Sequence, residues 1–124
     1  MKLFQFGSQV GRPITAFDSV NVVITPIQRT PGQVQIGCMH IGPQGRVGYH
    51  QAVGPQLFLV MQGSGWVRDA SDERTPISAG MAAFWTDGEW HESGSESGMT
   101  VIVIEGETLE PAQYLMEAQE AQEA

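Results

Sequence analysis

The chain has 124 residues, a length that suits a single domain with one hydrophobic core. Its 14 acidic and 6 basic residues give a formal net charge of −8, and the single lysine and five arginines are scattered along the chain, so nucleic acid and anionic membranes are poor partners. It has no apolar run near the roughly 20 residues of a membrane span, no signal-peptide core and a single cysteine, Cys38. These features predict a cytoplasmic protein without an intramolecular disulfide.

Short apolar stretches, separated by glycine and proline, predict an all-β sandwich or barrel over residues 1–110. The N-terminal segment 3–6 is a candidate edge strand, added within the chain or exchanged with a second copy. We expect further strands, in chain order, at 20–27, 34–40, 46–52, 57–62, 65–69, 81–86, 89–92 and 99–105. Residues 63–65 are expected to form a strand turn, and residues 69–76 a polar surface turn.

Two of these strands have informative faces. Val34, Ile36, Cys38 and His40 alternate with polar residues, so we expect this apolar face to point into the barrel. The run 100–104 is apolar on both faces and is expected to be central.

The C-terminal segment, residues 111–124, is predicted to form a short helix. Pro111 suits the first helical turn, and residues 112–124 contain no helix breaker. Tyr114, Leu115 and Ala118 form a thin apolar stripe that we expect to pack outside the barrel, while the last six residues are expected to fray.

Two glycine–histidine segments stand out from this background. The first contains Gly45, His50, Ala52, Gln56 and Gly63, and the second contains Gly80, Thr86, Gly88, His91 and Ser95. Together they resemble the two motifs of the cupin superfamily. The resemblance covers about forty per cent of the chain and implies a cupin jelly-roll β-barrel.

The resemblance also implies a divalent metal site, because cupins typically hold one metal through three histidines and a glutamate. This chain keeps His50 and His91 but has Ala52 in place of one histidine and Gln56 in place of the carboxylate. Alanine offers no lone pair, and an amide oxygen does not compensate the charge of the ion. The candidate metal ligands are therefore His50, Gln56 and His91, holding Zn, Ni, Fe or Mn weakly or holding no metal.

Four further residues are expected near this pocket: Cys38, His40, Ala52 and Trp85. Cys38 is better placed than His40 to act as an additional soft ligand. The alternatives are that Cys38 is an inert core residue, that His40 is a core or rim histidine, and that Trp85 is a core or interface residue.

Three functions are compatible with this pattern. The first is a small-molecule binding pocket in which His50, Gln56 and His91 are polar anchors. The second is a metal-dependent enzyme of dioxygenase or isomerase type acting on a small organic substrate. The third is metal-free acid–base catalysis by a neutral histidine. The resemblance also implies a homodimer.

Overall fold

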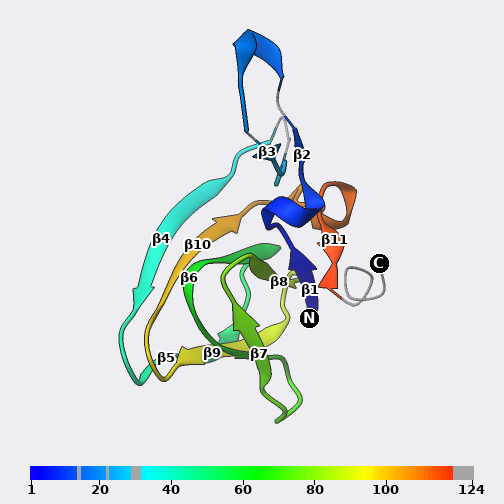
Figure 1. Ribbon diagram of the computed structural model, residues 1–124. Helices are drawn as coiled ribbons and strands as arrows, with labels where there is room; N and C mark the ends of the chain where they lie inside the picture. The colour runs from blue at the N-terminus through cyan, green and yellow to red at the C-terminus, as the bar shows by residue number, and fades with distance from the viewer. Residues whose placement is uncertain (14, 22, 29–31, 119–124) are drawn as a thin grey trace.

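The protein is described here by a computed structural model covering residues 1–13, 15–21, 23–28 and 32–118. Nine antiparallel strands form its body, and a separate two-stranded ribbon extends from it (Figure 1). The body strands are β1 (Lys2–Gln5), β4 (Gln35–Ile41), β5 (Gly45–Gln51), β6 (Gln56–Arg68), β7 (Thr75–Ser78), β8 (Met81–Trp85), β9 (Trp90–Ser95), β10 (Met99–Glu105) and β11 (Met116–Glu117). The all-β prediction is confirmed.

Strand β6 belongs to both layers of the body. Its first half pairs with β8 and β10 in the larger layer, whose strand order is β11-β1-β8-β6-β10-β4. Its second half pairs with β7 and β9, and β9 also pairs with β5. The predicted turn at 63–65 is therefore wrong: the strand continues and bends at Gly63, which has φ +86°. Glycine adopts this left-handed conformation without the steric cost that a side chain would add.

The hydrophobic core lies between the two layers. Its buried members come from both layers and from the long β6 strand: Ile41, Ala52, Phe58, Val60, Val67, Ile77, Ala83, Trp85, Met99 and Val101. A second cluster, which includes Phe4, Leu57, Leu59 and Leu115, lies on the outer face of the larger layer. Strand β10 contributes Val101 to the first cluster and Ile104 to the second, and it lies between β6 and β4 as predicted.

The predicted orientation of β4 is reversed. Met39 packs against the inner core and Ile41 is buried in it, whereas Ile36 and Cys38 are exposed on the opposite face. Both faces of this strand carry apolar residues, so the alternation that the sequence shows does not decide which face points inward.

Both terminal segments supply strands at one side of the larger layer, where β11 is the edge strand and β1 lies between β11 and β8. β1 pairs with β8 of the same chain, and β11 pairs with β1. The predicted C-terminal helix is wrong over residues 111–117, which form a single 3₁₀ turn, η3 (Pro111–Gln113), followed by β11. Leu115 and Ala118 are buried, in agreement with the expected apolar stripe. Residues 119–124 lie outside the described residues.

The ribbon consists of β2 (Arg12–Pro13) and β3 (Val23–Ile24), flanked by the 3₁₀ turns η1 (Ser8–Val10) and η2 (Ala16–Asp18). The predicted strand at 20–27 is thus reduced to two residues, and position 22 lies outside the described residues. Strand β7, which includes Pro76, was not predicted from the sequence. A proline is tolerated there because β7 is an edge strand that pairs only with β6. No helix in the described part of the chain is long and apolar enough to span a membrane.

The bend in β6 predicts a specific glycine requirement. A Cβ at position 63 would clash with the backbone oxygen of Gly98, in addition to being strained by the left-handed φ. We expect Gly63→Ala to lower the free energy of unfolding by about 2–4 kcal/mol in urea titrations. Gly37→Ala is the matched control, because a Cβ there meets no atom within 4 Å. Equal free energies of unfolding for the two variants would contradict the proposed constraint.

Candidate functional site

His50 and His91, which lie 41 positions apart in the sequence, face each other across two neighbouring strands. They are Cα partners in the antiparallel pairing of β5 with β9, beside a register shift in β5. Their ring centroids are 4.4 Å apart and the rings are tilted by 57°. His91 is 3% exposed, whereas His50 is exposed. The imidazole pair therefore has a buried member and a member that solvent reaches.

The same hydrogen-bond arrangement orients both rings. Nδ1 of His50 lies 2.6 Å from the carbonyl oxygen of Gly48, and Nδ1 of His91 lies 3.1 Å from that of Glu89. A carbonyl oxygen only accepts hydrogen bonds, so each Nδ1 carries the proton. In a neutral ring the lone pair is then on Nε2, where it can accept a hydrogen bond or bind a metal.

The backbone near the pair is held by hydrogen bonds between the end of β5 and the loop that joins β8 to β9. Ala52 donates to the carbonyl of Glu89 at 3.0 Å, and Gly88 donates to the carbonyl of Ala52 at 2.9 Å. Gly88 has φ +81°, a conformation that favours glycine. These two bonds position the carbonyl that orients His91.

The carboxylates near His91 in the sequence do not contact its ring. The carboxylate of Glu89 accepts from the backbone of Thr86 and from the N-terminal amine, and that of Asp87 accepts from Gly54. Glu92 accepts from Arg68 at 2.8 Å. The backbone, rather than an acid, therefore sets the tautomer of His91.

Burial lowers the pKa of His91, because the charged ring loses its hydration. The hydrogen bond to the carbonyl of Glu89 opposes this shift, and the neighbouring His50 ring adds to it. The net direction is downward from the usual value of 6.5. His91 is consequently neutral at pH 7.

Trp85 covers the other side of His91. The two rings are stacked with centroids 4.1 Å apart, and Phe58 meets the indole edge at 5.5 Å. Trp85 is completely buried, and its Nε1–H has no acceptor among the described residues. Buried hydrogen-bond donors almost always have an acceptor, so the unpaired indole N–H of Trp85 is an exception among the described residues.

Gln56 lies beside Trp85, since the two are Cα partners across β6 and β8. Its side-chain amide donates to Oε1 of Glu105 at 2.8 Å, and the structure shows no hydrogen bond from it to an imidazole. Glu105 was not predicted from the sequence as a neighbour of Gln56. It follows Val101 and Val103 at alternate positions of β10, and this spacing is the signal that would have assigned it to the same face.

The structure does not bring Cys38 and His40 to the imidazole pair. Both are exposed on the outer face of β4, with Sγ of Cys38 3.6 Å from Nε2 of His40. The expectation that they lie in the pocket is wrong, because β4 turns Met39 and Ile41 inward instead. Ala52, in contrast, is buried in the inner core.

The donor set that the structure describes does not fit a tightly bound metal. Two imidazoles stand together, Ala52 supplies no donor, and the amide of Gln56 is bonded to Glu105. No three His, Cys, Asp or Glu side chains of the described residues converge in a way that could hold an ion. A tight site needs three or four protein ligands.

Comparisons with known proteins bear on the fold. Neither models of protein families nor curated protein sequences match the chain. Solved structures do match it. A cupin superfamily protein from Desulfitobacterium hafniense aligns with a TM-score of 0.56 and 15% identity over 64% of this chain and 71% of that one.

Two other similar structures are of proteins named for an enzymatic activity. A predicted oxalate decarboxylase from Thermotoga maritima aligns with a TM-score of 0.51 and 24% identity over 56% of this chain and 62% of that one. The G106A mutant of salicylate 1,2-dioxygenase from Pseudoaminobacter salicylatoxidans aligns with a TM-score of 0.55 and 16% identity over 60% of this chain and 21% of that one. These structural similarities show that the chain has the cupin fold.

Proposed function

We propose that the chain binds a small organic molecule at the imidazole pair, without a tightly held metal. The observation that carries this proposal is the buried indole N–H of Trp85, which lacks an acceptor and belongs to a ring stacked on His91. A polar atom of a bound molecule would satisfy that donor. His50 is exposed to solvent, so such a molecule would reach the imidazole pair from the His50 side.

The chemistry of the three rings defines the class of ligand. Each neutral imidazole presents an Nε2 lone pair, which accepts a hydrogen bond, whereas the indole donates one. A compact molecule that carries both a hydroxyl and a carboxyl or carbonyl group meets both requirements. In this proposal Gln56, anchored by Glu105, is a further polar contact at the start of β6. The dioxygenase among the similar structures bears the name of such a hydroxy acid, salicylate.

A metal-dependent enzyme is the second candidate. The favouring observation is that both Nδ1 atoms face carbonyl oxygens, which leaves both Nε2 lone pairs for an ion. Two imidazoles would then hold the metal together with water or substrate. The missing donors at Ala52 and Gln56 count against this candidate. We also propose, from the sequence and its resemblance to cupins, that the chain is a cytoplasmic homodimer.

Ligand binding can be tested at the indole itself. In ¹⁵N-labelled protein, we expect salicylate to shift the Trp85 Nε1–H resonance, because its carboxylate would accept a hydrogen bond from this donor. Trp85→Phe assigns the resonance among the three indoles of the chain. Benzoate is the matched probe without the hydroxyl and should bind more weakly. Shifts confined to Trp66 and Trp90 for both probes would contradict the proposal.

Metal content separates the two candidates. We expect the purified protein to contain less than about 0.2 equivalents of Zn, Ni, Fe and Mn together after dialysis, because two imidazoles hold an ion weakly. The His50→Ala/His91→Ala double variant should contain the same trace amount. A full equivalent that is lost in the double variant would favour the metal enzyme and overturn the proposed metal-free pocket.

The lowered pKa of His91 predicts a pH-dependent stability. The unfolded chain binds a proton at this ring more readily than the folded chain does, so the free energy of unfolding falls as the pH drops below about 6.5. We expect His91→Gln to remove this contribution, of at most about 1.4 kcal/mol per pH unit, in urea titrations between about pH 7 and pH 5. His40→Gln, which alters an exposed histidine, should keep the wild-type slope. A wild-type slope in His91→Gln would show that His91 is not the responsible group.

A further inference from the structure

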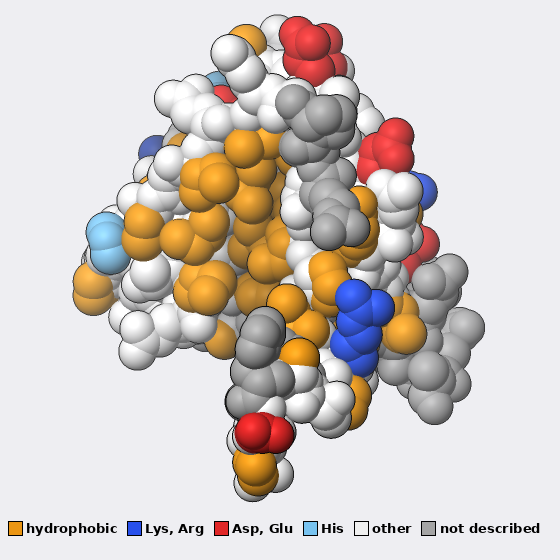
Figure 2. All heavy atoms as spheres, turned by 90° about the horizontal axis from the view of Figure 1, so that it is seen from above, with side chains coloured by type: hydrophobic (Ala, Val, Ile, Leu, Met, Phe, Trp, Pro, Cys, Tyr) orange, Lys and Arg blue, Asp and Glu red, His pale blue; other side chains and the backbone are white. Residues whose placement is uncertain are grey.

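We propose a second ligand site, outside the barrel, for a small amphipathic molecule with an apolar body and one carboxylate. A recess of about 1000 Å³ lies between the ribbon, the outer face of the larger layer and the segment around η3. The face seen in Figure 2 carries a broad apolar area. Because this recess is on the outer face and the imidazole pair is on β5 and β9, the proposal does not rest on the function proposed above.

The floor and walls of the recess are apolar. Ile36 and Ile104 come from neighbouring strands and are Cα partners, while Ile24, Ile27 and Val34 come from the ribbon and the segments next to it. Ile36 is 62% exposed and Ile24 is 43% exposed. Contiguous exposed apolar surface of this kind marks a binding site in a folded protein.

One end of the recess is positively charged. Arg12 is its only basic residue among those the structure describes, and its guanidinium has no ion pair with any described side chain. None of the 14 described lining residues is acidic, in a chain that carries 14 acidic side chains. The net charge of −8 disfavours the approach of anions to the chain as a whole. The end of the recess at Arg12 is an exception, because it carries a positive charge and no acidic lining residue.

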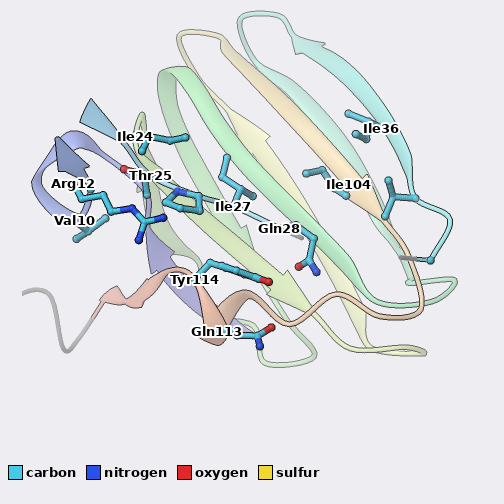
Figure 3. A pocket seen from close by; sticks show the side chains of 14 residues that line it. Val10, Arg12, Ile24, Thr25, Ile27, Gln28, Ile36, Ile104, Gln113 and Tyr114 are labelled. Atoms are coloured by element: carbon cyan, nitrogen blue, oxygen red, sulfur yellow. The ribbon is translucent and has the colours of Figure 1, made fainter. Parts of the chain in front are cut away.

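Arg12 lies at one end of the recess, and apolar side chains extend from there to the opposite end. Figure 3 shows Arg12 next to Val10 and Ile24, with Ile36 and Ile104 toward the other end. A molecule of matching polarity would place its carboxylate at the guanidinium and its apolar body along the two isoleucines. Apolar burial would then supply most of the affinity, and the charge would set the orientation.

Titration calorimetry with decanoate and with 1-decanol tests this assignment on the full chain. We expect decanoate to bind the wild-type protein. The Arg12→Gln substitution should weaken the affinity for decanoate by about threefold to tenfold and leave the affinity for decanol unchanged. Arg74→Gln is the matched control, because its guanidinium lies over the Trp66 ring, outside the recess. Ile36→Asp should weaken decanoate by more than tenfold, because it adds a like charge to the apolar end.

Three results would overturn the proposal. The first is no detectable decanoate binding to the wild-type protein. The second is an equal effect of Arg12→Gln and Arg74→Gln on decanoate. The third is a dimer, detected by light scattering, that does not bind decanoate and that the Ile36→Asp substitution dissociates. This result would assign the apolar face to contact with a second copy of the chain. Unchanged decanoate affinity in the His50→Ala/His91→Ala variant is expected if the two sites are separate.

Discussion

The passage of one strand through both layers is the constraint on which this molecule depends. β6 pairs with β8 and β10 over its first half and with β7 and β9 over its second half, and it changes direction at Gly63. The bend is possible because residue 63 has no side chain next to the backbone of Gly98. It brings β9, which carries His91, over the same core as β8, which carries Trp85. The stacking of these two rings is thus a consequence of how the two layers are joined.

The proposed binding chemistry follows from backbone geometry more than from charged side chains. Carbonyl oxygens set the tautomers of both histidines, and burial beneath Trp85 keeps His91 neutral. This arrangement leaves lone pairs on the imidazoles and a donor on the indole, without a nearby carboxylate bonded to either ring. Such a pair suits recognition of a neutral or anionic polar group better than it suits retention of a divalent ion, which requires charge compensation.

The sequence predicted the fold and the imidazole pair for different reasons. Strands rich in β-branched residues, such as 99–105, are recognisable locally, and the two glycine–histidine segments carry the resemblance to cupins. Which face of β4 points inward was not predictable, because Ile36 and Cys38 on one side compete with Met39 and Ile41 on the other. The helix expected after Pro111 gave way to pairing of Met116 and Glu117 with β1, a tertiary contact that overrides local propensity. Glu105 was missed because its contact with Gln56 depends on strand register.

The most direct test of the central claim is a long-range ¹H–¹⁵N correlation spectrum of the histidine side chains at pH 7.5, combined with nuclear Overhauser contacts between the rings. Our account predicts the Nδ1–H tautomer for both His50 and His91, a neutral His91, and cross-peaks between the carbon-bound protons of the two rings. A protonated His91, or two rings without mutual contacts, would contradict it.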